Sequence, residues 1–120
     1  MNVKYQHFSE GTLRRRLGDA ISPAAIVQIY LEESPALVQD LVLERDSPKS
    51  LDSLAACTHR LKGSLAMLCA SPATEIAEHL IKACRREDSV AALALCDQLL
   101  RHLRSLKTEL ERYVKTNGSG

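Results

Sequence analysis

Leucines spaced three and four residues apart in the centre of the chain constrain its fold most strongly. Between residues 48 and 69 the predicted buried stripe recurs with the period of an α-helix: Leu51, Leu54, Thr58, Leu61, Leu65 and Leu68. A helix with one apolar face must bury that face against another element. Hydrophobic residues make up 45% of the chain, with no tryptophan and one phenylalanine. Leucine and alanine therefore do most of the packing, which is typical of helix bundles rather than β-sandwiches.

Serine–proline pairs mark the expected starts of three long helices: Ser22-Pro23, Ser47-Pro48 and Ser71-Pro72. Serine caps a helix N-terminus well, and proline suits the first turn because the N–H that it lacks would be unpaired there. The remaining starts and stops are Asp88-Ser89, Ser9 and Gly18. Together these signals predict a short helix from Ser9 to about Leu17 and long helices over about 23–45, 48–69, 72–87 and 89–115.

Ser34-Pro35 lies inside the first of the long helical patterns. Proline in a helix interior clashes with the carbonyl four residues back. Tyr30, Leu37 and Leu41 nevertheless continue one apolar stripe across it. We expect a single helix over 23–45 that is kinked near residues 31–34, with a break into two shorter helices as the alternative.

Short loops between long amphipathic helices predict antiparallel neighbours, and hence an all-α, up-down four-helix bundle with a short N-terminal capping helix. We expect one domain over 1–120, with an ordered core at about 8–115, loosely ordered residues 1–8 and a flexible tail at 116–120. No apolar run reaches the roughly 18 residues of a membrane span. The net charge of +1 gives no field that would attract nucleic acid. We expect the isolated domain to be a monomer.

Two groups of residues favour unremarkable roles. Arg14, Arg15 and Arg16 point in different directions on a short helix and are expected to be solvated. The four cysteines form no C-x-x-C pair, so we expect reduced, half-buried thiols: Cys57, Cys69, Cys84 and Cys96. A zinc site that joins them to His59, His79 or His102 is the alternative, which the spacings do not support.

The stretch from Thr58 to Ser64 conflicts with a purely structural helix. His59 and Lys62 fall off the buried stripe, and Gly63 costs about 0.5–1 kcal/mol relative to alanine in a helix interior. Their face is otherwise small, with Ala56 and Ala66 beside them. Residues 53–74 contain no aspartate or glutamate, so the face is expected to be locally positive and to suit a partner with an acidic pocket. A compact anionic group could approach the imidazole there.

The run His59-Arg60-Leu61-Lys62-Gly63-Ser64-Leu65-Ala66-Met67-Leu68-Cys69-Ala70 resembles the motif of the histidine-containing phosphotransfer (HPt) domain. That motif is roughly His-x-x-Lys-Gly-Ser, then small and apolar residues, then Leu-Gly-Ala. Cys69 departs from it, and we expect an effect on helix packing but no loss of a chemical group. The upstream run Tyr30-Leu31-Glu32-Glu33-Ser34-Pro35-Ala36-Leu37 resembles the family's Phe-Leu-Glu-Glu-x-Pro-x-Leu. The resemblance covers roughly residues 8–115, and its specific part is the His59 motif.

This resemblance implies a phosphorelay carrier. His59 would accept a phosphoryl group from the aspartyl phosphate of a hybrid sensor kinase's receiver domain and pass it to an aspartate of a response regulator. Lys62 would neutralise phosphoryl charge. The receiver-docking surface would comprise Gly63, Ser64, Arg60, Ala56 and Ala66.

The chain is expected to act without a nucleotide or metal of its own. It has no glycine-rich phosphate loop and no paired carboxylates for Mg²⁺, so the resemblance places Mg²⁺ in the partner receiver domain. We expect a phosphotransfer intermediate rather than an enzyme with an ATP site. The expected location is cytoplasmic, either as a stand-alone protein or as the cytoplasmic end of a membrane-bound hybrid kinase. A structural adaptor bundle that binds partner helices without chemistry is the alternative function.

Overall fold

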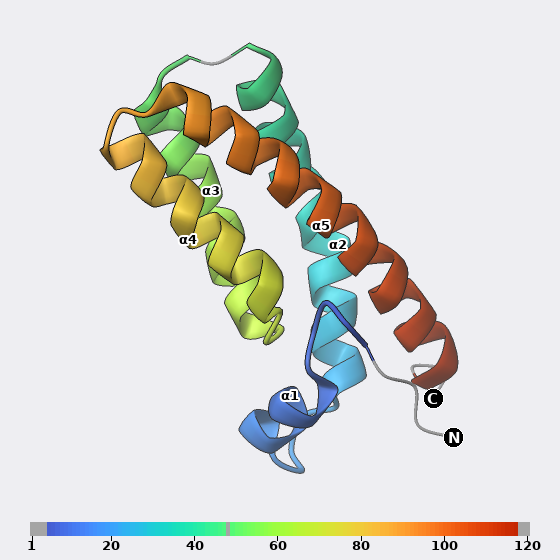
Figure 1. The fold of residues 1–120 in the computed structure, drawn as a ribbon. Coiled ribbons are helices and arrows are strands. Elements are labelled where there is room, and N and C mark those ends of the chain that lie inside the picture. The colour runs from blue at the N-terminus through green and yellow to red at the C-terminus, as the bar shows by residue number, and fades with distance from the viewer. Residues whose placement is uncertain (1–4, 48, 118–120) are drawn as a thin grey trace.

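The computed structural model describes residues 5–47 and 49–117, and within them the chain forms five helices (Figure 1). A short helix precedes four long ones, and the bounds are α1 Glu10–Leu17, α2 Pro23–Asp46, α3 Leu51–Met67, α4 Ser71–Arg85 and α5 Ser89–Asn117. Helix α5 runs two residues past its predicted end. The rest of the predicted tail, residues 118–120, lies outside the described residues.

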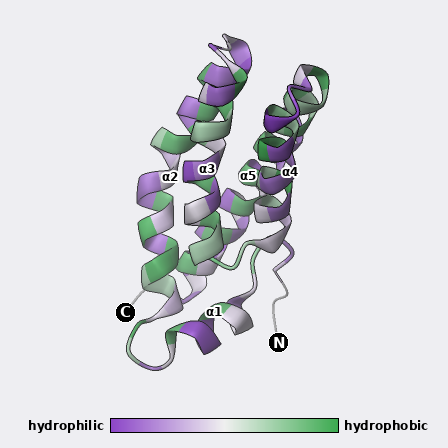
Figure 2. Cartoon of the chain, turned by 90° about the vertical axis from the view of Figure 1, so that its left-hand side faces the viewer, coloured by the Kyte–Doolittle hydropathy of each residue, from purple (hydrophilic) through white to green (hydrophobic). Residues whose placement is uncertain are grey.

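The four long helices form an antiparallel bundle, as the sequence predicts. Each packs against two others, in the order α2, α3, α4, α5 and back to α2. Successive long helices run in opposite directions, and α1 lies across the end of the bundle at which α2 begins (Figures 1 and 2). Helix α1 buries Leu13 completely, so it covers that end rather than projecting from it.

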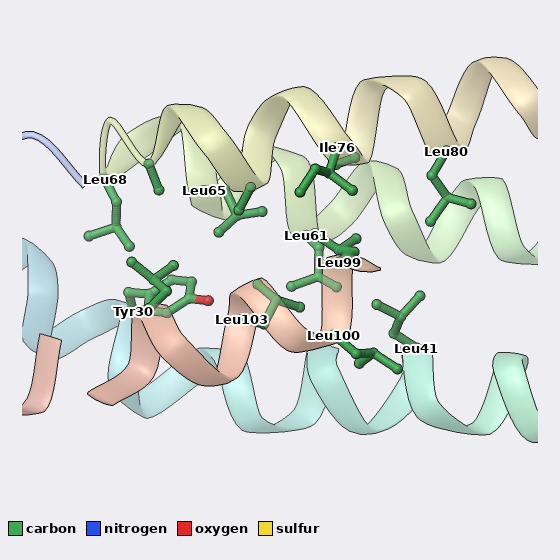
Figure 3. Close-up of a cluster of buried hydrophobic side chains, with 14 of the residues drawn as sticks. Tyr30, Leu41, Leu61, Leu65, Leu68, Ile76, Leu80, Leu99, Leu100 and Leu103 are labelled. Carbon is green, nitrogen blue, oxygen red and sulfur yellow. The ribbon is translucent and has the colours of Figure 1, made fainter. Parts of the chain in front are cut away.

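Leucine fills most of the space between the long helices. In Figure 3 the labelled leucines of α2, α3 and α5 point into one cluster, joined by Ile76 and Leu80 of α4. Hydrophobic and hydrophilic residues alternate around each helix in Figure 2, in keeping with one inward face per helix. Of the predicted stripes, Leu37, Leu51 and Leu95 are only partly buried and pack at the edge of the core.

Several predicted helix ends are confirmed. The hydroxyl of Ser9 accepts a hydrogen bond from the backbone N–H of Thr12, and Ser22 caps α2 in the same way. Gly18 ends α1 with a φ of 67°, a left-handed value that glycine adopts without strain. The Asp88 carboxylate accepts a hydrogen bond from the N–H of Ala91 at the start of α5.

Two other helix starts were predicted wrongly. Helix α3 begins at Leu51 rather than at residue 48, because the side chain of Ser50 accepts the N–H of Ser53 and supplies the cap. Pro48 itself lies outside the described residues. Helix α4 begins at Ser71, one residue early, and its N-cap, Ala70, makes no side-chain hydrogen bond. The α3 and α4 helices also end two residues before the predicted ends, at Met67 and Arg85.

Helix α2 runs without interruption through Pro35, so the prediction of one helix is confirmed and the alternative of two helices is wrong. Pro35 is exposed, while its neighbour Ser34 is buried. The kink near residues 31–34 stays a prediction.

The segment before α1 is packed, in contrast to the predicted loose N-terminus. Phe8 is 4% exposed and its ring lies 5.4 Å from that of Tyr113. The buried carboxylate of Glu109 accepts the backbone N–H groups of Gln6 and His7 at 3.2 and 3.0 Å. The carboxylate of Glu109 therefore binds residues 6–7 to α5. Local sequence patterns do not predict a contact between residues so far apart in the chain. Residues 1–4 lie outside the described part of the chain.

The three arginines of α1 are exposed, as predicted. One of them, Arg16, also makes a hydrogen bond to another helix, which was not predicted from the sequence. Arg16 Nη1 donates to the carbonyl of Ala66 at 2.9 Å, at the C-terminal end of α3. The last carbonyls of a helix have no partner within the helix and attract cations. Arg16 thus joins α1 to the end of α3. Arg14, by contrast, pairs with Glu10 on its own helix at 2.7 Å.

All four cysteines are free thiols and more deeply buried than predicted, at 0–8% exposure. Burial raises the pKa of Cys96 to about 11 and also raises the pKa values of Cys57 and Cys84. These three side chains therefore stay neutral thiols near pH 7, which disfavours metal binding. Among the described residues no three His, Cys, Asp or Glu side chains are arranged to hold a metal ion. In the same part of the chain no helix is both long and apolar enough to cross a membrane.

Cys69 occupies a backbone position that favours glycine. Its φ is 57°, and its N–H bonds to the carbonyl of Ala66 while that of Ala70 bonds to Leu65. These two bonds form a Schellman motif, whose left-handed residue is usually glycine. The departure from the HPt motif at this position is therefore a matter of backbone strain, not of chemistry.

We predict that Cys69→Gly is more stable than Cys69→Ala by about 0.5–1 kcal/mol, because both variants lose the thiol and only alanine stays strained. Urea unfolding of the two variants measures the difference. Cys84 lies inside α4 and is equally buried, so the same pair of substitutions there should give the opposite order. An alanine variant at least as stable as the glycine variant at position 69 would contradict the assignment.

Candidate functional site

His59 lies on the outer face of α3, as the sequence predicts. The inward face of this helix holds Leu54, Leu61 and Leu65, at 0–1% exposure, together with the fully buried Thr58. The hydroxyl of Thr58 donates to the carbonyl of Leu54, so this polar side chain is satisfied within the core. The imidazole of His59 is exposed and available to a second molecule.

The surface along α3 beside His59 is open. Gly63 is exposed, and a Cβ added there would meet no atom within 4 Å. Ala56 and Ala66 are also exposed, and Ser64 is partly buried. Met67, two turns from His59, is 51% exposed and adds an apolar side chain that the sequence analysis did not include. A large protein surface could therefore approach the imidazole along this helix.

The α4 side of His59 is hollowed and mainly cationic. A surface depression there is lined by His59, Lys62, Glu78, Ile81, Lys82 and Arg85. Lys62 Nζ lies 3.5 Å from Glu78 Oε1, with both side chains partly exposed. Glu78 thus brings one carboxylate from the neighbouring helix to a face that was expected to be locally positive, and the lining of the depression stays mainly cationic.

On the side of α3 that faces α2, the charged side chains belong to a separate depression. Arg60 Nη2 lies 3.8 Å from Asp40 Oδ2 of α2, so this arginine turns away from the depression that holds His59. Arg60 and Ala56 line a second depression between α2 and α3, together with Asp40 and the buried Glu44. Of the other predicted site residues, only Lys62 lines the depression that holds His59. Arg60 and Ala56 lie on the other flank of α3.

The other histidines lack these surroundings. His79 is exposed on α4. His102 is half-buried, and its ring lies 5.5 Å from that of His7. His7 in turn has its Nε2 3.5 Å from the carboxylate of Glu109. These two rings belong to the contact between the N-terminal segment and α5.

The α4 residues of the site were not predicted from the sequence. Glu78, Lys82 and Arg85 recur four and three residues apart, so they lie on one face of α4. This periodicity is visible in the sequence. The periodicity does not show, however, that this face of α4 lies beside His59. That fact depends on how α3 and α4 pack.

The arrangement suits the transfer of a small anionic group. A histidine ring nitrogen is a nucleophile, and it stands beside lysine and arginine side chains that neutralise charge. Transfer of a phosphoryl group consists mainly of such positioning and neutralisation.

Comparison with known proteins identifies one protein family. The family model of the Hpt domain matches residues 25–114, which span α2 to α5 and include His59 and Lys62. Comparisons with curated proteins and with solved structures gave no significant match. Since the family model covers most of the chain, the chain belongs to the Hpt domain family, whose members carry out histidine phosphotransfer in phosphorelays and interact with receiver domains.

Proposed function

We propose that His59 is the phosphoacceptor of this Hpt domain. The lone pair of an imidazole nitrogen attacks the phosphorus of an aspartyl phosphate on a receiver domain. The P–O bond to that aspartate breaks, and its carboxylate leaves with the bonding electrons. Donation to an aspartate of a response regulator is the same step in reverse, with the imidazole as leaving group. The observation that carries this assignment is the exposed imidazole of His59 in a cationic depression, within the residues that the family model matches.

Lys62 is proposed to neutralise the phosphoryl group. It lines the same depression as His59 and stands one helical turn away. An ammonium group acts on phosphoryl oxygens as a compact point charge, which suits a group that must be bound and released.

The partner is proposed to dock along the outer face of α3. Gly63 and Ala66 offer an exposed surface without bulk next to His59, Ser64 lies between them, and Ala56 and Arg60 extend it toward α2. We propose that the receiver domain holds the Mg²⁺ needed for aspartyl phosphate chemistry. We also propose that the Hpt domain of this chain acts as a monomer. The upstream donor is proposed to be a hybrid sensor histidine kinase, and the location of the transfer is proposed to be the cytoplasm.

The direct test uses a phosphorylated receiver domain. Incubation with it should place a phosphoryl group on this chain, and that group should be lost in acid and stable in base, as phosphohistidine is. The conservative variant His59→Gln should accept none, while His79→Gln, also exposed, should accept as much as the native chain. Equal acceptance by His59→Gln would refute the assignment to His59, whereas no acceptance by the native chain would favour the alternative of a non-catalytic adaptor.

Lys62→Ala should slow transfer without unfolding the domain, because Lys62 is only partly buried. The loss of one charge-assisted contact, about 1.5–3 kcal/mol if it acts mainly in the transition state, corresponds to about ten- to a hundredfold in rate. Rapid-quench kinetics with a phosphorylated receiver measures the effect. Lys107→Ala on the exposed face of α5 is the matched control. A Lys62→Ala rate equal to the control rate would show that Lys62 is only solvated.

Gly63 is proposed to be retained for access rather than for backbone conformation. Gly63→Ala meets no clash and should leave the melting temperature equal or higher, since alanine has the better helix propensity. Gly63→Leu should also fold but should weaken receiver binding and slow transfer, because its side chain stands one turn from His59.

A melting curve paired with receiver affinity and transfer rate tests both Gly63 variants. Ala94→Leu places the same side chain at an exposed position of α5 and should leave all three quantities unchanged. If Gly63→Leu binds and transfers as Ala94→Leu does, the receiver docks elsewhere. If Gly63→Leu unfolds the domain, Gly63 is a packing residue.

A further inference from the structure

Helix α4 supplies most of the charged groups around His59. The depression beside the imidazole contains three cationic side chains and one carboxylate, namely Lys62, Lys82, Arg85 and Glu78. Three of these four come from α4. The family motif that runs along α3 accounts only for Lys62, so the remaining three need a separate explanation.

In the unphosphorylated protein Glu78 engages Lys62. The distance from Glu78 Oε1 to Lys62 Nζ is 3.5 Å, and the two side chains are 44% and 34% exposed. A partly exposed ion pair of this kind is weak, so a stronger anion can replace the carboxylate. A phosphoryl group is such an anion, because it carries more negative charge than a carboxylate and has three acceptor oxygens.

We propose that Glu78 is a positioning residue that holds Lys62 beside His59 before phosphorylation and loses it to the phosphoryl group afterwards. Lys82 and Arg85 bind the phosphoryl oxygens from the α4 side. This inference rests on the proposed function, since it requires a phosphorylated His59. It makes the reaction an exchange of one anion for another at Lys62.

Opposite effects of the α4 charges on phosphorylation follow from this exchange. Glu78 opposes the reaction, because Lys62 must leave it before it can bind the phosphoryl group. Lys82 and Arg85 favour the reaction, because each adds positive charge to the same depression. A purely structural role for these exposed side chains would give neither effect.

The test uses phosphoramidate, a small phosphodonor that needs no receiver domain. The lone pair of a ring nitrogen of His59 attacks phosphorus, and the P–N bond of phosphoramidate breaks. Ammonia leaves with the bonding electrons, and the imidazole gives its N–H proton to water. The rate constant of phosphohistidine formation on the full chain is followed by ³¹P NMR.

Glu78→Gln should raise this rate constant by about two- to fivefold, the factor that corresponds to the loss of a partly exposed ion pair. Glu75→Gln removes the same charge one turn earlier on α4, at an exposed residue outside the His59 depression, and should leave the rate unchanged. Lys82→Gln and Arg85→Gln should each lower the rate by about two- to fivefold. Arg86→Gln, next to Arg85 but outside the depression, is their control.

A double substitution shows whether Glu78 acts through Lys62. Residues that act on each other give non-additive effects. In a Lys62→Gln background, Glu78→Gln should therefore change the rate by less than about 1.5-fold. The ¹⁵N resonance of Lys62 Nζ gives a direct view, since phosphorylation should shift it more in the native chain than in Glu78→Gln.

Equal rates for Glu78→Gln and Glu75→Gln would overturn the inference, and so would a full Glu78→Gln gain in the Lys62→Gln background. In both cases His59 would still be phosphorylated, and the proposed function would stand. Failure of both phosphoramidate and a phosphorylated receiver to modify His59 would overturn the proposed function, and this inference with it.

Discussion

Burial of the leucine face of α3 fixes the outward position of His59 and Gly63. Leu54, Leu61 and Leu65 are at most 1% exposed, so α3 cannot rotate without moving leucine into water. Because the helix is rigid, His59 and Gly63 must then face outward. The packing of the hydrophobic core thus also holds the imidazole of His59 in a fixed and accessible place. The two neighbours of α3 in the bundle decide which charges flank it.

The two cationic side chains of α3 that follow His59 are already paired in the unphosphorylated domain. Arg60 is directed toward Asp40 of α2, and Lys62 is directed toward Glu78 of α4. A free ammonium beside His59 would bind a phosphoryl group tightly and release it slowly. A competing carboxylate weakens that binding, which suits a carrier that must both receive and donate. In the mechanism that we propose, phosphoryl transfer through this domain is an exchange of ionic partners on a rigid helix rather than a change in fold.

The sequence predicts the inward and outward faces of the helices well, because helix periodicity and burial arise from the same residues. His59 is exposed for the reason given by the α3 stripe, and α2 continues through Pro35 as the apolar stripe across it indicates. Contacts between distant segments could not be predicted in this way. Glu109 holding residues 6–7 and Arg16 reaching the carbonyl of Ala66 join residues far apart in the chain.

In the site, too, the contacts between helices could not be predicted from the sequence. The α3 half follows from local spacing, whereas the α4 half depends on the rotation of α4 against α3, which only packing determines. Helix starts were misjudged where capping chemistry is ambiguous: Ser47 and Ser50 both precede α3, and the side chain of Ser50 makes the hydrogen bond. Cys69 was read as a packing change, while its positive φ makes it a backbone effect. A sequence motif names the residue type at that position but not its dihedral angle.

The central claim is that one histidine of this chain carries the phosphoryl group. The most direct measurement is tandem mass spectrometry of the phosphorylated native chain, with fragmentation at neutral to basic pH that preserves the P–N bond. It distinguishes all four histidines in one sample. The account predicts phosphate on the peptide ion that carries His59 and none on those that carry His7, His79 or His102. Phosphate on any of these other histidines, or on no histidine, would contradict it.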